Sequence, residues 1–159
     1  MFNKKSVAAV VPAYNEEKFI GKVITTMPDF VDKIIVIDDV SKDKTKEIVK
    51  EYMKTNKKVI LIEHEKNQGV GGSIISGYKK ALELNIDVAA VMAGDAQMHP
   101  EDLKTVIAPV LNGEADYVKG NRLFHKDVQK TMPQLRYFGN SVLTLLTKIA
   151  SGYWYIMDP

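Results

Sequence analysis

Asp95 is the residue whose type and position most directly suggest chemistry. It follows an apolar stretch, residues 87–92, and a glycine, Gly94, so backbone room for a ligand lies beside it. A carboxylate at the rim of a crevice suits a hard divalent cation that also takes oxygens from a diphosphate. The same aspartate could instead cap the helix that we expect near Pro100 or hold a turn, and spacing alone does not decide between these roles and metal binding.

Two adjacent carboxylates form a second candidate. Asp38 and Asp39 close the apolar stretch 33–38, and Asp43 follows. One of the pair could cap a helix while the other accepts hydrogen bonds from a base or a ribose; taken alone, the pattern favours capping. Tyr14 could stack on a base, although a single tyrosine in a loop more often serves packing.

Other well-known kinds of site are missing from the sequence. Residues 69–72, Gly-Val-Gly-Gly, follow the third apolar stretch instead of the first and lack the spacing of a dinucleotide-binding loop. His64, His99 and His125 lie in separate loops without metal-ligand spacing. No cysteine is present, so disulfides and thiolate chemistry are excluded. The candidate chemistry therefore rests on carboxylates and cationic side chains.

These residues need secondary structure that brings them together, and the chain alternates short apolar stretches with amphipathic ones. We expect strands at 6–11, 33–38, 59–63, 87–92 and 115–119. We expect helices at 16–27, 42–53, 69–84, 99–111 and 135–149. This alternation predicts an α/β fold with a doubly wound, mostly parallel sheet flanked by helices.

The loops that follow the strands should form one site, because ligands of such sheets bind beyond the carboxyl ends of the strands. Those loops are residues 12–17, 38–41, 93–97 and 120–122. They carry acidic, amide, aromatic and arginine side chains. This edge of the sheet is where we expect function.

Composition sets limits on size and partners. The 159 residues are 45% hydrophobic and 26% charged, which is typical of one globular domain. The net charge of +2 is too small to indicate a nucleic-acid partner. Residues 141–157 are the one stretch to consider for membrane insertion, but they are too short and Lys148 interrupts them.

A basic segment followed by aromatic residues suggests contact with a membrane surface. Arg122, Lys126, Lys130 and Arg136 precede the aromatic run 153–155. Cations near anionic headgroups and aromatic rings at the interface are typical of peripheral membrane elements. A solvated surface is the alternative for any such run of charges.

Taken in order, the motifs at the strand ends resemble the family 2 glycosyltransferases of the GT-A fold, above all the dolichyl- and polyprenyl-phosphate sugar transferases such as dolichol-phosphate mannose synthase. The motifs are Val-Pro-Ala-Tyr-Asn-Glu-Glu at 11–17, Ile-Asp-Asp-Val-Ser-Lys-Asp-Lys-Thr at 37–45, Asn-Gln-Gly at 67–69, Gly-Asp-Ala-Gln-Met-His-Pro at 94–100 and Lys-Gly-Asn-Arg at 119–122. Such a series is far more specific than any member of it. We therefore expect residues 1–159 to form a single GT-A catalytic domain, cut short at its carboxyl end.

The resemblance implies a donor site in the first loops. The residues that would line the nucleotide pocket are Pro12, Ala13, Tyr14, Glu16, Gly94 and Asp95. Asp38 or Asp39 would hold the base or ribose. Asp95 and Gln97 would hold Mg²⁺ or Mn²⁺ together with the diphosphate. Ala93 stands where the metal motif of the family often has its first aspartate, which leaves Asp95 as the main carboxylate.

The resemblance also implies catalytic residues further along the chain. Arg122 and Arg136 would meet the donor diphosphate or the acceptor phosphate, and Asp158 would begin the Asp-Pro segment of the family. The implied reaction is inverting transfer of a sugar from a UDP- or GDP-sugar to a polyprenyl or dolichyl phosphate. Its place would be the cytoplasmic face of a membrane, with the protein peripheral or anchored there.

Two alternative functions stay open. A transferase that acts on a sugar or protein hydroxyl would need a carboxylate base, for which Asp158 is the candidate. A non-catalytic nucleotide-sugar-binding module is the other, and Ala93 slightly favours it. A nucleotidyltransferase is disfavoured, because Pro-Ala-Tyr-Asn-Glu replaces the glycine-rich basic loop of that class.

Overall fold

The structure is a computed structural model that describes residues 5–120, 134–152 and 154, with the side chains of 134–137 outside that description. The chain divides into two compact units, Met1–Val118 and Lys119–Pro159, and each is described by itself. The expectation of a single domain over residues 1–159 stays a prediction.

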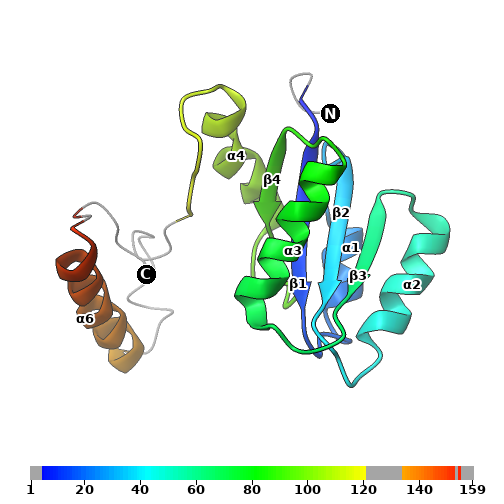
Figure 1. The fold of residues 1–159 in the computed structure, drawn as a ribbon, viewed down its shortest axis with the longest axis horizontal. Helices are drawn as coiled ribbons and strands as arrows, with labels where there is room; N and C mark the ends of the chain where they lie inside the picture. Colours follow the sequence, from blue (N-terminus) through cyan, green and yellow to red (C-terminus); the bar gives the residue numbers. More distant parts are fainter. Residues whose placement is uncertain (1–4, 121–133, 153, 155–159) are drawn as a thin grey trace. The chain divides into compact units, whose positions relative to one another are not determined.

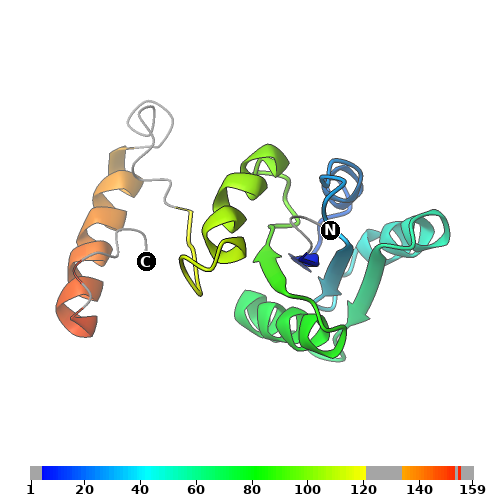
Figure 2. The same cartoon turned by 90° about the horizontal axis from the view of Figure 1, so that it is seen from above.

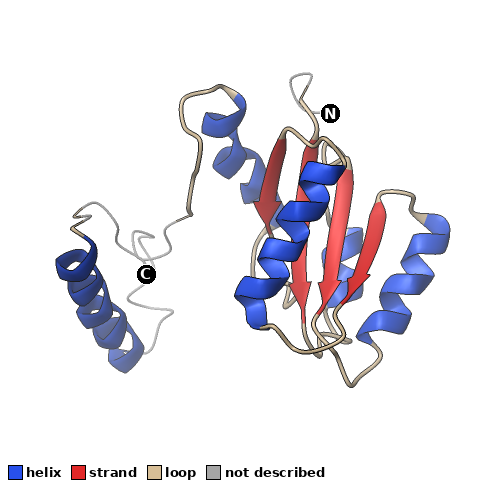
Figure 3. Ribbon diagram, viewed as in Figure 1, coloured by secondary structure: helices blue, strands red, loops and turns tan. Residues whose placement is uncertain are grey.

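The first unit is built on a parallel sheet with the strand order β3-β2-β1-β4 (Figures 1 and 3). The strands are β1 Val7–Ala13, β2 Lys33–Asp38, β3 Val59–Glu63 and β4 Val88–Val91. The strands β2 and β3 are added on one side of β1, and β4 is then added on the other side. The direction in which the chain builds the sheet therefore reverses at β1. Ligands of such sheets bind at this reversal, beyond the carboxyl ends of the strands. The predicted doubly wound parallel sheet is confirmed.

Helices cover both faces of the sheet. One face packs against α1 (Ile20–Thr25), α2 (Thr45–Thr55) and α4 (Leu103–Leu111), and the other packs against α3 (Gly69–Glu83) (Figure 2). A short 3₁₀ helix, η1 (Pro100–Asp102), precedes α4. The strands β1 and β2 are buried on both faces, which accounts for their unbroken runs of Val, Ile and Ala.

The backbone of α3 lies very close to the sheet at Gly77. A Cβ atom at this position would collide with Val10 Cγ1 and would lie 3.0 Å from Ile37 Cδ1. Only a residue without a side chain permits this approach. The contact fixes α3 against β1 and β2. It also fixes the first residues of α3, which follow the loop after β3.

Two helices begin later than the sequence predicts, for a shared reason. We expected helices from residues 16 and 42, whereas α1 begins at Ile20 and α2 at Thr45. The Glu16 amide donates to the side chain of Thr45, and the Thr45 amide donates to the carboxylate of Asp43. The first bond holds Glu16 in the loop before α1, and the second bond fixes Thr45 as the first residue of α2.

The expected fifth strand at 115–119 is wrong. Among the described residues the sheet has four strands, and 115–119 contains none. The Ala115 amide turns back to the carbonyl of Pro109, and Tyr117 is exposed. Charged residues at 114, 116 and 119 leave the segment too little apolar surface to pair with the sheet.

The helix described in the second unit is α6, Gln134–Ser151, which confirms the helix expected at 135–149. Across the part of the chain that the structure describes, no helix combines the length and apolarity needed to cross a bilayer.

Candidate functional site

The carboxyl ends of the strands place the predicted loops along one edge of the sheet. Ala13 is aligned with Asp38, and Asp38 with Glu63, so the polar residues that follow β1, β2 and β3 leave the sheet side by side. The β4 loop joins them on the other side of β1. We call this row of loops the carboxyl edge.

The loop after β1 is fastened to the loop before α2 by reciprocal hydrogen bonds, which we call the clasp. Residues 15–17 donate three amides to side chains of the second loop, and residues 42 and 44 donate amides back. The bonds are Asn15 N to Ser41 Oγ (3.0 Å), Glu16 N to Thr45 Oγ1 (2.8 Å), Glu17 N to Asp43 Oδ2 (3.0 Å), Lys42 N to Asn15 Oδ1 (2.8 Å) and Lys44 N to Glu17 Oε2 (3.1 Å). The clasp fixes the backbone that carries Tyr14 and Glu16.

Thr45 is the buried centre of the clasp. Its hydroxyl accepts the Glu16 amide and donates to Asp43 Oδ1 at 2.5 Å. Burial by itself would raise the pKa of Asp43, but the hydrogen bonds from the Thr45 hydroxyl and from nearby amides outweigh it and lower that pKa. Asp43 therefore stays ionised as a structural anchor.

Asp38 has one carboxylate oxygen that is buried and unpartnered. Its side chain is 1% exposed, and Oδ2 accepts the Ser41 amide at 3.1 Å. Oδ1 has no hydrogen-bond partner among the described residues. Because buried polar atoms are almost always paired, this oxygen is suited to a donor supplied by a ligand.

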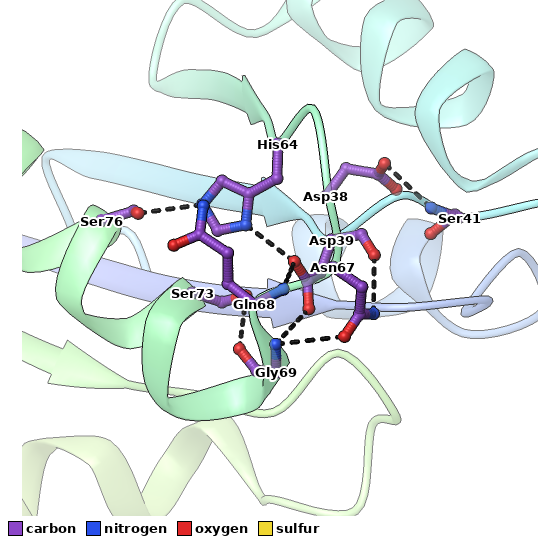
Figure 4. A network of polar contacts seen from close by, with 9 residues as sticks. All are labelled: Asp38, Asp39, Ser41, His64, Asn67, Gln68, Gly69, Ser73 and Ser76. Atoms are coloured by element: carbon purple, nitrogen blue, oxygen red, sulfur yellow. Dashed lines mark hydrogen bonds and ion pairs between the residues drawn. The ribbon is translucent and has the colours of Figure 1, made fainter.

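Asp39, in contrast, is fully engaged within the chain (Figure 4). Its Oδ1 contacts His64 Nδ1 at 2.7 Å and accepts the Gln68 amide at 2.9 Å, and its Oδ2 accepts the Gly69 amide at 2.8 Å. Burial alone would raise the pKa of Asp39, but these hydrogen bonds outweigh it and lower the pKa. Asp39 is therefore an ionised anchor at the start of α3.

Val40 follows the pair in a left-handed conformation, with φ of 66°. This conformation is rare for a β-branched residue and costs of order 1–3 kcal/mol. The turn from β2 to α2 is therefore strained, and the hydrogen bonds around it must compensate.

The β4 loop approaches the end of β1 at Gly94. A Cβ atom there would lie 3.0 Å from the Pro12 carbonyl oxygen and 3.4 Å from Glu16 Cγ. The pKa of Glu16 is raised above its ordinary value. Burial of Glu16 is the largest cause, and the negative charges of Asp95 and Asp43 add to it. Carboxylates of the β1 loop and the β4 loop therefore lie near one another at this part of the sheet.

Asp95 does not cap the following helix. Its Oδ1 accepts the Gln97 amide at 3.0 Å, and Ala96 has a left-handed φ of 57°. The residue that caps η1 is His99, without a side-chain bond. The capping role that spacing allowed for Asp95 is therefore wrong, whereas the turn role is confirmed for Oδ1. Oδ2 of Asp95 accepts no hydrogen bond from the described residues.

The described residues hold no ready-made cluster of three or more His, Cys, Asp or Glu side chains for a metal ion. Asp95 and Gln97 lie together in the β4 loop, and Gln97 is exposed. A cation here would need oxygens from a bound ligand to complete its shell.

The carboxyl edge brings together most of the predicted site. The residues found there are Pro12, Ala13, Tyr14, Glu16, Asp38, Asp39, Gly94, Asp95 and Gln97. Arg122 and Asp158 lie outside the described residues, and Arg136 belongs to α6 with its side chain outside the description.

Sequence reasoning missed Thr45 and His64. Thr45 is a buried polar residue at a helix start, and His64 directly follows the third strand. The position of His64 directly after a strand was the available signal for a role at this site. The spacing of the histidines bears only on metal binding and gives no such signal.

Comparisons with known proteins identify the family. The sequence profile described as Glycosyl transferase family 2 matches residues 8–156. A UDP-N-acetylglucosamine–dolichyl-phosphate N-acetylglucosaminyltransferase of Methanococcus voltae is 40% identical over 167 residues, which cover 97% of this chain and 66% of the relative. A dolichol-phosphate mannosyltransferase of Pyrococcus furiosus is 30% identical over 126 residues, which cover 74% of this chain and 35% of the relative. The chain thus spans at most about two thirds of these proteins.

Solved structures show the same fold. Residues 1–349 of S. aureus TarS in complex with UDP align with a TM-score of 0.56 and 25% identity over 70% of this chain and 33% of that one. A mannosyltransferase of Pyrobaculum calidifontis in complex with GDP-Man and Mn²⁺ aligns with a TM-score of 0.56 and 20% identity over 65% of this chain and 31% of that one. The parallel sheet and its helices form the expected GT-A fold.

Proposed function

The chain belongs to glycosyl transferase family 2, and from this membership we propose that it transfers a sugar from a nucleotide diphosphate to a polyprenyl or dolichyl phosphate. The relatives from Methanococcus voltae and Pyrococcus furiosus are named as dolichyl-phosphate transferases, which supports this acceptor. The first of them is named for UDP-N-acetylglucosamine, so this is the donor to test first.

The observation that carries the proposal is the unpartnered Oδ1 of Asp38. It is buried at the carboxyl end of β2, beside the end of β1 and the β1 loop that the clasp holds. An N–H group of a base or a hydroxyl of a ribose would give this oxygen the partner that the described residues do not supply. Asp38 therefore takes the nucleotide-binding role, and Asp39 holds the loop around it.

The rest of the nucleotide pocket lies beside Asp38. We assign its wall to Pro12, Ala13, Tyr14, Glu16 and Gly94. Tyr14 is 47% exposed, so its ring is accessible for stacking on a base. The absence of a Cβ atom at Gly94 leaves the β4 loop in contact with the Pro12 carbonyl, and the diphosphate would follow this loop toward Asp95.

The residues present fit a divalent cation that arrives with the donor. Asp95 offers a carboxylate oxygen without a partner among the described residues, and Gln97 offers an exposed amide. The pKa of Glu16 is raised first by burial and then by the charges of Asp95 and Asp43, which a cation would help to balance. When bound, Mg²⁺ or Mn²⁺ would neutralise charge that develops on the leaving diphosphate. The Mn²⁺ in the Pyrobaculum mannosyltransferase supports this choice of ion.

The reaction is a direct displacement. An oxygen of the acceptor phosphate attacks the anomeric carbon while the bond to the diphosphate breaks, so the configuration inverts. The acceptor phosphate is already ionised at neutral pH, so the chain must position it instead of removing a proton. We assign that positioning to Arg122 and Arg136, because planar guanidinium groups bind phosphate with two hydrogen bonds. Asp158 would belong to the same centre.

The acceptor would place the protein at a membrane surface, and we propose its cytoplasmic face. The basic segment with Arg122, Lys126, Lys130 and Arg136 would contact anionic headgroups there. Association of this kind weakens as salt screens the charges. Binding to vesicles of anionic lipid should therefore fall as the salt concentration rises.

A transfer assay tests the proposal. The protein is incubated with radiolabelled UDP-N-acetylglucosamine or GDP-mannose, Mn²⁺ and dolichyl phosphate, and the lipid phase is counted. We expect a labelled lipid with one donor, and none when dolichol replaces dolichyl phosphate. Binding of nucleotide without transfer to any acceptor would favour a non-catalytic nucleotide-sugar-binding module. Transfer only to sugar or protein hydroxyls would favour a transferase that acts on hydroxyl acceptors.

A further inference from the structure

A chain of three hydrogen-bonded side chains, Asp39, His64 and the half-buried Ser76, lies beside the nucleotide site (Figure 4). The proposed function leaves His64 and Ser76 without a role. His64 Nδ1 lies 2.7 Å from Asp39 Oδ1, and His64 Nε2 lies 2.9 Å from Ser76 Oγ. The side chains of His64 and Asp39 are each 5% exposed. Both imidazole nitrogens are therefore committed to partners inside the chain.

The chain connects three elements that meet at the carboxyl edge. Asp39 directly follows β2, His64 directly follows β3, and Ser76 lies within α3. The backbone adds to these links, because the His64 amide donates to the Asp38 carbonyl at 3.0 Å and Asn67 Nδ2 donates to the Asp39 carbonyl at 3.1 Å. A displacement of His64 would therefore also shift the backbone of Asp38.

The turn that contains Asp38 and Asp39 needs such support. Val40 holds a left-handed φ of 66°, a conformation that persists in a β-branched residue only when the surroundings enforce it. On the β1 side the Asp39 amide donates to the Ala13 carbonyl at 2.9 Å. On the other side the supports are His64, Asn67 and the start of α3.

The order Asp–His–Ser also resembles a nucleophilic triad, but the surroundings do not fit one. Ser76 lies in the middle of α3, where neighbouring amides are used by the helix and cannot bind an oxyanion. Asp39 is bound to the amides of Gln68 and Gly69 as well as to His64, which suits an anchor. The contacts of Asp39, His64 and Ser76 therefore fit a structural anchor and not a catalytic triad.

We propose that His64 is a positioning residue for the nucleotide site. It acts through Asp39: with Ser76 fixing one side of its ring, it holds the Asp39 carboxylate and thereby the turn that presents Asp38 Oδ1. The effect on binding rests on the proposed function, whereas the effect on the turn does not.

Four variants separate the two ends of the imidazole. His64→Ala removes both contacts. His64→Asn places an amide near the position of Nδ1 and keeps the donor for Asp39, while Ser76→Ala removes the outer contact alone. The matched control is Ser73→Ala, because Ser73 is a buried serine of the same helix whose hydroxyl donates to the Gly69 carbonyl of α3 itself.

The first readout is hydrogen exchange at the Gln68 and Gly69 amides, measured in the full chain. His64→Ala should speed exchange at these two amides by about tenfold or more, since their acceptor is no longer held. Core amides such as those of Val10 and Ile35 report general destabilisation and should change much less. Equal acceleration at the core and at the two amides, or no acceleration at either, would overturn the proposal.

The second readout is the affinity for UDP and GDP by calorimetry. His64→Ala should weaken binding by about tenfold or more, His64→Asn by about threefold or less, and Ser76→Ala by an intermediate factor. Unchanged affinity in a folded His64→Ala protein would overturn the positioning role. If the unaltered chain bound no nucleotide, the proposed function would fail, and exchange at Gln68 and Gly69 would still decide whether His64 holds the turn.

Discussion

The two halves of the carboxyl edge are built in different ways. On the β2–β3 side Asp39 and Asp43 are ringed by hydrogen-bond donors, and both pKa values are lowered. On the β4 side Asp95 accepts one hydrogen bond from the described residues. The pKa of Glu16 beside it is raised, first by burial and then by the charges of Asp95 and Asp43. The carboxylates of the first half are held by the protein itself, whereas Asp95 keeps an oxygen that a ligand can use.

The difference suggests a division of labour. The side chains of the first half are fixed before any ligand arrives, which suits recognition of a nucleoside. The second half gains its partners from the donor, because a cation and a diphosphate would complete the shell around Asp95. Substitutions should therefore have different signatures. Stability should be affected at the anchors of the first half, nucleotide affinity at Asp38, and turnover in the second half.

The largest effect is expected from Asp95→Ala. Loss of the main carboxylate of the β4 half should lower the rate of sugar transfer by at least about 100-fold, because charge on the leaving diphosphate is no longer balanced. The melting temperature should stay close to that of the unaltered chain, since Asp95 supports one local hydrogen bond. Transfer and thermal melts measure both. Asp116→Ala, at an exposed aspartate outside the edge, is the control and should change neither.

Asp38→Asn should separate binding from folding within the first half. The amide keeps an acceptor for Ser41 but offers a donor where Oδ1 was, so nucleotide affinity should fall by about 10- to 100-fold. The free energy of unfolding should change by less than about 1 kcal/mol, because Oδ1 has no partner to lose among the described residues. Urea denaturation and calorimetry give the two values. Asp39→Asn, which weakens an anchor, should instead lower the free energy of unfolding by about 1–3 kcal/mol.

Thr45→Val tests the clasp with a side chain of the same shape. It leaves the Glu16 amide and Asp43 without the buried hydroxyl, which should lower the free energy of unfolding by about 1–3 kcal/mol. Nucleotide affinity should fall only a few-fold, because Thr45 acts through the β1 loop. Thr55→Val, at an exposed threonine of the same helix, is the matched control. Equal losses in the two variants would show that the clasp contributes nothing special.

The smallest effects should appear in the dependence of stability on pH, with opposite signs in the two halves. The lowered pKa of Asp39 gives stability that is present above its ordinary pKa of 3.8 and is lost as the pH falls through the lowered value. The raised pKa of Glu16 gives stability that is present below its ordinary pKa of 4.5 and is lost as the pH rises through the raised value. Between pH 3 and 7, the stability difference between the unaltered chain and Asp39→Asn should grow with pH, and the difference from Glu16→Gln should shrink. Slopes of the same sign would contradict the comparison.

The sequence predicted the architecture because its signals are local. The apolar runs at 33–38 and 59–63 match β2 and β3, and the rule that loops after parallel strands share one edge placed Asp38, Gly94 and Asp95 together. The predicted start of α1 was wrong because Glu16 is bonded to Thr45, 29 positions away, and no local pattern encodes such a bond. The predicted start of α2 was wrong because Asp43 binds the Thr45 amide, a local bond that hydrophobic periodicity alone does not reveal. The strand expected at 115–119 failed because strand pairing depends on an available partner as well as on composition.

The sequence also could not show which of Asp38 and Asp39 is an anchor and which has a carboxylate oxygen left for a ligand. Two adjacent aspartates have the same chemistry, and only the position of His64 and the start of α3 decides which one is engaged. The residues after a strand are thus worth testing as anchors as well as ligands. His64 would have been identified by that rule.

The most direct test is a calorimetric titration of the chain with UDP, GDP, UDP-N-acetylglucosamine and GDP-mannose, with and without Mn²⁺. We predict that one nucleotide class binds without metal through the β2–β3 half and binds about tenfold or more tightly with Mn²⁺. Asp95→Ala should lose the gain from metal and keep the metal-free binding. No binding under any condition, or a gain from metal that survives in Asp95→Ala, would contradict the account.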